Sequence, residues 1–143
     1  MASTARATWA TSVALLPGML PAYGQLFETD SKRLGGGKVD IVIRKTAQRP
    51  DVSVLSMEIG TVGSSVGSSF FILCSVRQLA LERGGYRYVV KIERHGKPAQ
   101  MIIGLLRTRE DAPAKLGPEF ASPRATFQVI DLERFAPICD QMN

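Results

Sequence analysis

The stretch Tyr86–Arg107, YRYVVKIERHGKPAQMIIGLLR, decides the fold prediction because apolar residues alternate with polar ones on both sides of His95-Gly96. Such alternation indicates two strands joined as a β-hairpin, with His95-Gly96 as a two-residue turn. We expect Arg94 to pair with Lys97. That register places further pairs on one apolar face: Ile92 with Ala99, Val90 with Met101, Tyr88 with Ile103 and Tyr86 with Leu105.

A helix is predicted immediately before this hairpin, over residues 68–83, and Gly84-Gly85 suits a left-handed C-cap. One side of the helix would carry Ile72, Leu73, Val76, Leu79 and Ala80, and the other Ser75, Gln78 and Glu82. Phe71 falls on the polar side, where either another segment covers it or a partner contacts it. We expect the stripe of Ile72, Val76 and Ala80 to pack against Val90, Met101 and Ile103.

The remaining strands are predicted at residues 39–44 and 54–59, on either side of a turn at 48–51, and at residues 125–132. Residues 109–123 contain three prolines and indicate a long loop, and Pro137 should keep the tail from forming a regular helix. The predicted order is strand, strand, helix, strand, strand, strand. This is an α+β fold in which an antiparallel sheet of about five strands carries one main helix on one face.

The first 24 residues contain Arg6, no acidic residue, a small and apolar run, and small residues at Ala22 and Gly24. This order is typical of a secretory signal peptide cleaved before Gln25, and it would leave no transmembrane segment in the mature chain. An N-terminal helix of a cytoplasmic protein and an organelle transit peptide are the alternatives. We therefore divide the 143 residues into a signal peptide (1–24), a linker (25–37) and a single domain (38–143).

Cys74 and Cys139 lack CxxC spacing, and His95 is the only histidine. A zinc site is not expected from so few ligands, and no pattern in the chain predicts a cofactor. In an exported protein the two cysteines could form a disulfide; otherwise Cys74 is a small core residue and Cys139 a tail thiol.

The segment GTVGSSVGSS, residues 60–69, lies between a predicted strand and the predicted helix. It lacks the lysine that a phosphate-binding P-loop requires. Residues 63–67 match Gly-x-Ser-x-Gly, so a small serine hydrolase with Ser65 as nucleophile is one alternative function. The hydroxyl would need a base, and His95 is expected at the far hairpin tip.

The net charge of +5 is compatible with an anionic polymer as partner. Tyr86 and Tyr88 in a basic strand also resemble the aromatic strand of an RNA-recognition motif, so a nucleic-acid or polyanion-binding module is a second alternative. The predicted strand order differs from that motif, and the pairing places both rings under the helix. The candidate binding residues are Phe71, Arg87, Lys91, Arg94, Lys97, Arg107 and Arg109.

Three runs, Val54–Gly60, Phe70–Arg83 and Gly85–Val90, together resemble the core of small proteobacterial envelope lipoproteins of unknown function. The chain departs from that family because no lipid-attachment cysteine follows the leader and the turn after Gly60 lacks an asparagine. The resemblance implies an envelope protein and supplies no catalytic residue. We therefore expect an exported, monomeric or weakly self-associating domain that binds an envelope protein or an anionic polymer and is not an enzyme.

Overall fold

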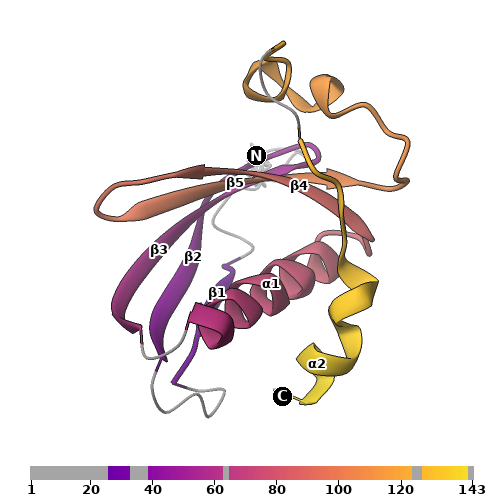
Figure 1. Ribbon diagram of the computed structural model, residues 1–143. Coiled ribbons are helices and arrows are strands. Elements are labelled where there is room, and N and C mark those ends of the chain that lie inside the picture. The colour runs from indigo at the N-terminus through magenta and orange to yellow at the C-terminus, as the bar shows by residue number, and fades with distance from the viewer. Residues whose placement is uncertain (1–25, 33–38, 63–64, 124–126, 142–143) are drawn as a thin grey trace, which may run out of the picture.

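The protein forms one antiparallel sheet that curls as a half-barrel around a central helix (Figure 1). The computed structural model describes residues 26–32, 39–62, 65–123 and 127–141. The six strands are β1 (Glu28–Asp30), β2 (Val39–Arg49), β3 (Val52–Val62), β4 (Tyr88–Arg94), β5 (Ala99–Leu106) and β6 (Ile130–Asp131), paired in the order β1-β2-β3-β5-β4-β6. The helices are α1 (Ser65–Glu82) and α2 (Ala136–Gln141), with short 3-10 segments η2 (Pro113–Leu116), η3 (Pro118–Phe120) and η4 (Leu132–Phe135). The predicted α+β class is confirmed, with one strand more than expected.

The main core lies between the concave face of the sheet and helix α1. Alternation in β2 and β3 explains it, since Ile41 and Ile43 in β2, and Leu55 and Met57 in β3, occupy alternate positions and point inward. The predicted β2–β3 hairpin is confirmed, and its chain reverses at Pro50-Asp51. The inward side chains of the sheet include Ile41, Ile43, Leu55, Met101, Ile103 and Leu105, each at most 2% exposed.

Helix α1 begins slightly earlier than predicted and ends as predicted, where Gly84 and Gly85 take positive φ values of 131° and 77°. Its buried face, however, is rotated toward Phe71 and Ser75, which are both 2% exposed. Phe71 is therefore a core residue and is unavailable as a surface contact, which corrects its assignment to the binding set. The sheet curls far enough around the helix to cover this side as well. Ser75 is accommodated because its Oγ accepts a hydrogen bond of 2.8 Å from Thr29 Oγ1.

The β4–β5 hairpin is confirmed as a pair of strands, but its predicted register is wrong. Arg94 pairs with Gln100 and Lys91 with Ile103, so residues 95–98 form the loop. Pro98 favours the longer loop, because β5 pairs with β3 on one side and β4 on the other, and proline is disfavoured inside such a central strand. Met101 and Ile103 still join the core with Val76 and Ala80, whereas Val90 points to the opposite face of the sheet. Tyr86 is buried in the main core, while Tyr88 packs on the outer face.

A second apolar layer covers the convex face, where the segment after β5 folds back over the sheet (Figure 1). Its centre is Phe120, packed with Val52, Val90, Ile102 and Leu106. The predicted long loop 109–123 thus contains the two short helical segments η2 and η3. Its apolar side chains pack on the convex face of the sheet.

Two further expectations from the sequence are wrong. Residues 28–30, expected in a linker, form β1 and pair with β2. The segment is polar, yet Thr29 and Ser31 are buried because their hydroxyls form hydrogen bonds, including one that Ser31 Oγ accepts from Ile41 N. At the other end, Pro137 lies in the first turn of α2, where a missing N–H costs nothing. The predicted signal peptide lies outside the described residues.

Candidate functional site: a groove between α1 and β4

An open cavity of about 440 Å³ lies where α1, β4 and the segment after residue 127 meet. We call it the β4 groove. Its apolar lining comes from Ile72, Leu73, Val129, Ile130 and Phe135, which are all partly exposed. Its cationic lining comes from Lys91, Arg109 and Arg134. The volume falls in the range of pockets that hold small organic ligands.

The groove exists because β6 is short. β6 pairs with β4 at only two positions, Tyr88 with Asp131 and Val89 with Ile130. Gln128 and Val129 precede β6 without joining the ladder, and they line the groove opposite Lys91. The chain therefore separates from β4 at the point where a longer β6 would have continued the pairing.

The three cations of the groove differ in how strongly they are already paired. Lys91 Nζ lies 2.6 Å from Glu93 Oε1, so its charge is compensated. Arg109 lies over the Tyr88 ring at 5.6 Å from the centroid, its Nη2 is as far as 4.0 Å from Asp131 Oδ2, and its side chain is 51% exposed. Arg134 is exposed and has no hydrogen bond or ion pair with any part of the chain that the structure describes. Arg134 and Arg109 are thus the cations most available to a ligand.

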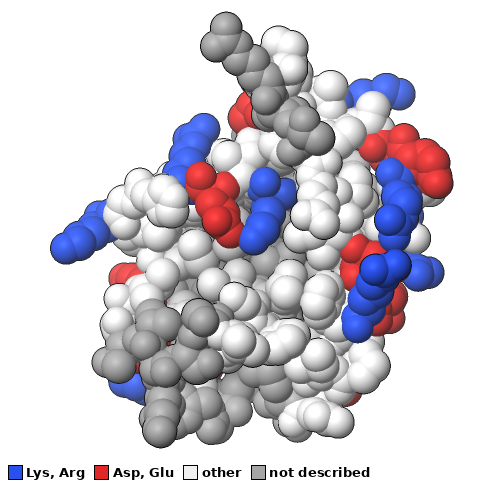
Figure 2. Space-filling model, in the orientation of Figure 1, with Lys and Arg blue, Asp and Glu red and all other residues white. Residues whose placement is uncertain are grey.

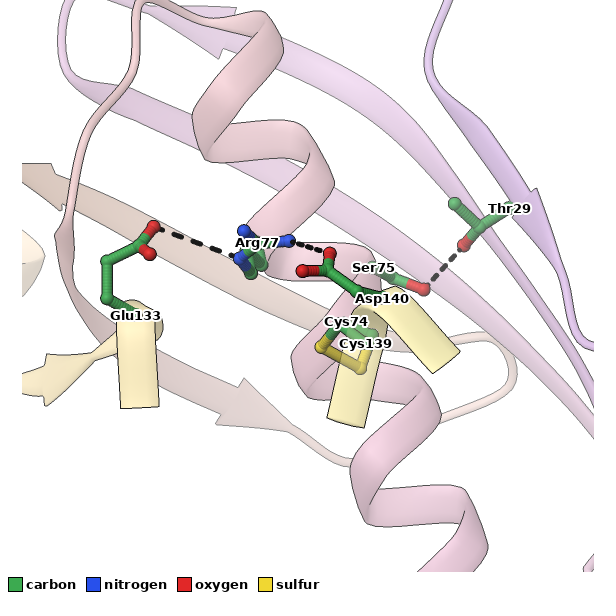
Figure 3. The surroundings of a disulfide bond; sticks show 7 residues. All are labelled: Thr29, Cys74, Ser75, Arg77, Glu133, Cys139 and Asp140. Carbon is green, nitrogen blue, oxygen red and sulfur yellow. Dashed lines mark hydrogen bonds and ion pairs between the residues drawn. A yellow bond between two sulfur atoms is a disulfide. The ribbon is translucent and has the colours of Figure 1, made fainter. Parts of the chain in front are cut away.

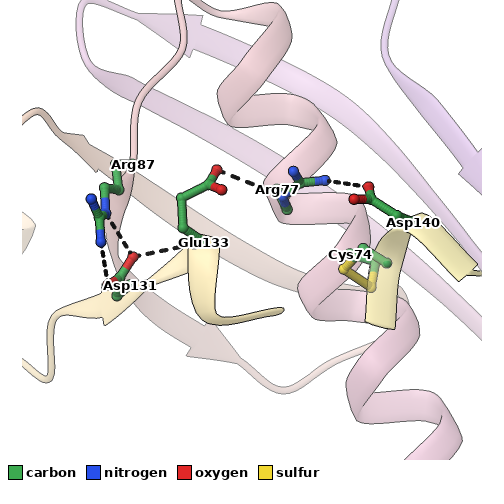
Figure 4. Close-up of polar contacts among 7 residues, drawn as sticks. Cys74, Arg77, Arg87, Asp131, Glu133 and Asp140 are labelled. Atoms are coloured by element: carbon green, nitrogen blue, oxygen red, sulfur yellow. Dashed lines mark hydrogen bonds and ion pairs between the residues drawn. A yellow bond between two sulfur atoms is a disulfide. The ribbon is translucent and has the colours of Figure 1, made fainter. Parts of the chain in front are cut away.

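Asp131 is the acidic group at the base of the groove, and Arg87 neutralises it (Figure 4). Arg87 Nε and Nη2 donate to its two carboxylate oxygens at 3.0 and 3.1 Å, and Glu133 N donates at 3.2 Å. The bonds from Arg87 are the main cause of the lowered pKa of Asp131. Because both acids of the lining are paired, the groove presents a net positive charge to a ligand.

The C-terminal segment that forms one wall of the groove is fixed to α1 (Figure 3). A disulfide joins Cys74 of α1 to Cys139 of α2, with the two Cα atoms 5.3 Å apart. Beside it, Arg77 forms ion pairs with Asp140 at 3.3 Å and with Glu133 at 3.9 Å. These links come from the two walls themselves, because Leu73 precedes Cys74 and Phe135 lies in the turn before α2.

The basic residues predicted as a binding surface do not gather in one place. Arg87, Lys91 and Arg109 lie at or beside the groove. Lys97 lines a different hollow near the β4–β5 loop, and Arg107 lies in a third, 4.4 Å from the centroid of the Tyr86 ring. Figure 2 shows basic and acidic side chains interspersed over the visible face. Arg94 and Lys97 are exposed at the hairpin tip.

Sequence reasoning missed Arg134 and Phe135. Both follow a two-residue strand and lie in η4, which brings them to the groove. No local sequence pattern marks them, because their place depends on where β6 ends.

The structure gives a hydrolase site no support. Gly63 and Ser64 lie outside the described residues, and Ser65 is the first residue of α1. His95 lies exposed in the β4–β5 loop and, within the described residues, has no acidic partner to orient it as a base. In the same part of the chain no group of three or more metal-ligating side chains comes together.

No family model, no curated protein and no solved structure matches this chain. The resemblance to small envelope lipoproteins therefore stays a prediction. Among the described residues, no helix has the length and apolar character needed to cross a membrane.

Proposed function

We propose that this chain is an exported cell-envelope protein that acts as a non-enzymatic binding module and holds an anionic envelope component in the β4 groove. The observation that carries the proposal is the disulfide between Cys74 and Cys139, which uses both cysteines of the sequence. Disulfides persist in the periplasm and outside the cell and are rare in the cytosol. The apolar run within residues 1–24 adds support, since it is typical of a signal peptide.

The charge of the groove supports an anionic partner over a neutral one. Arg109 and Arg134 both line a partly apolar hollow, and its two acids, Asp131 and Glu93, are paired with Arg87 and Lys91. RNA fits less well, because Arg87 and Arg109 already lie over the Tyr88 ring, where a base would have to stack.

The export step is tested by expressing the whole chain in a bacterial host and measuring the mass of the protein in the periplasmic extract. We expect a chain that begins at Gln25 and whose thiols react with maleimide only after reduction. Leu15→Arg interrupts the apolar run and should keep the protein in the cytosol, whereas the matched Ser3→Arg should still be exported. A cytosolic protein that retains Met1 and has two reactive thiols would contradict the proposal.

A further inference from the structure

The β4 groove has the two chemical features that an amphiphile requires, an apolar floor and a cationic rim. The floor consists of side chains from α1 and from the C-terminal segment that the core leaves partly uncovered. Ile72 and Ile130 pack inward against the main core, and Leu73 and Phe135 extend the same surface outward. An alkyl chain laid on this surface would remove apolar area from water on both sides of the contact.

Two arginines of the same lining, Arg109 and Arg134, supply the positive charge of the rim. Arg134 has no partner within the described residues, and Arg109 is held only by the Tyr88 ring and by a distant contact with Asp131. Guanidinium groups bind carboxylate and phosphate oxygens through paired N–H donors. A negatively charged head between these two side chains would make ion pairs that the free protein lacks.

Resting on the function proposed above, we propose that the β4 groove binds a single-chain amphiphile with an anionic head, carboxylate or phosphate. The alkyl chain lies on Leu73, Ile130 and Phe135, and the head lies between Arg134 and Arg109. An extended polymer is a poorer fit, because the described basic residues Arg109, Arg107 and Lys97 line three separate hollows.

The disulfide has a second role in this arrangement. It ties the wall that carries Leu73 to the wall that carries Phe135, so the two halves of the apolar floor keep their spacing. A site whose walls are fixed before binding loses less conformational entropy when the ligand enters. Reduction of the disulfide should therefore weaken binding.

Calorimetric titration with decanoate, decyl phosphate and decanol, each below its aggregation limit, tests the proposal on the purified mature protein. We expect one molecule of decanoate or decyl phosphate to bind per chain, and decanol to bind at least about tenfold more weakly because it has no charge. The tighter of the two anions identifies the natural head group. Equal binding of decanol and both anions, or no binding of either anion by folded protein, would overturn the proposal.

Two substitutions in the lining test whether the ligand binds in the β4 groove. Arg134→Gln should weaken decanoate binding about tenfold, since one charged donor is lost, while Arg94→Gln removes the same charge at the remote hairpin tip and should change nothing. Leu73→Gln should weaken the binding of decanoate by a similar factor, because it removes apolar lining from the groove. Circular dichroism verifies that each variant is folded. Equal losses in Arg134→Gln and Arg94→Gln would show that only overall charge matters and would refute the site. If these binding experiments fail while the protein is exported and its disulfide is formed, the assignment to the cell envelope stands and only the proposed amphiphilic ligand is rejected.

Discussion

Breaking the Cys74–Cys139 disulfide should lower the free energy of unfolding by about 4 kcal/mol. The bond joins residues that are 65 apart in the sequence, and the chain-entropy model gives about 4 kcal/mol at 25 °C for a loop of that length. Single domains are stable by only about 5–15 kcal/mol, so this loss is a large fraction of the total. After reduction, the ion pairs of Arg77 with Asp140 and Glu133 remain to hold α2, but solvent weakens them because the two acids are 66% and 46% exposed.

The assay is equilibrium unfolding in urea, with the oxidised protein compared with the same protein in reductant. The thermal midpoint should fall by about 15 °C on reduction, given the unfolding entropy of a domain of this size. The slope of unfolding free energy against urea should also rise, because the unfolded chain without its cross-link exposes more surface. A double variant, Cys74→Ala with Cys139→Ala, should match the reduced protein and be insensitive to reductant.

The expected effect comes from the loop that the bond closes and not from local contacts of the sulfur atoms. It would be refuted by a reduced protein whose unfolding free energy lies within about 1 kcal/mol of the oxidised form, a quarter of what the loop predicts. A drop of the expected size with an unchanged urea slope would also contradict it, because the cross-link then would not act through the unfolded chain.

Three further predictions concern the two sides of the sheet and the base of the groove. Gly104→Ala should lower the free energy of unfolding in urea by about 1–3 kcal/mol, because the added Cβ would lie 2.9 Å from Val90 Cγ2 in the closely packed apolar layer on the convex face. Unchanged stability would show that this layer has room for a methyl group. Phe71→Ala should cost about 4 kcal/mol, and Phe70→Ala, at the half-buried neighbouring position, clearly less; equal costs would contradict the rotated helix face. Asp131→Asn should lower stability at neutral pH by about 1–2 kcal/mol, since it removes the charged acceptor of two arginine hydrogen bonds. Because the folded-state pKa of Asp131 is lowered, its contribution is present above the ordinary aspartate pKa and is lost as pH falls through the folded value. The stability of Asp131→Asn should therefore approach that of the wild type in acid, and a gap that stays constant with pH would exclude the ion pair as its cause.

The sequence predicted the elements whose signals are local. Alternation along β2 and β3 and the Gly84-Gly85 stop of α1 act within a few residues, and both were placed correctly. It failed where a distant residue decides the outcome. In the polar strand β1, Thr29 is buried, and its hydroxyl donates a hydrogen bond to Ser75 on the helix, 46 residues away in the sequence. The hairpin register was wrong for a local reason, because the His95-Gly96 turn was favoured on its type alone, whereas Pro98 is disfavoured inside a central strand and lies in the loop.

Most of the candidate site could not be predicted, because it lies where the regular pattern stops. A sequence pattern indicates that a strand exists more reliably than where its bounds lie, and the groove is set by the late start of β6, which leaves Gln128 and Val129 unpaired with β4. The basic residues were visible in the sequence, yet their charge alone did not show which of them a neighbouring acid already neutralises. Arg87 is bound by Asp131 and Lys91 by Glu93, while Arg134, which has neither, was not selected.

One signal for the groove nevertheless lies in β4 itself. In the observed register Lys91 pairs with Ile103 and Glu93 with Met101, so these two charged side chains occupy the face that Val89 and the core residues share. Charged groups under a packed helix would lose hydration at a cost of several kcal/mol each. Their side chains are instead 37% and 51% exposed. A charged pair on the core face of a strand therefore marks where α1 no longer covers the sheet, and the opening that results is the β4 groove.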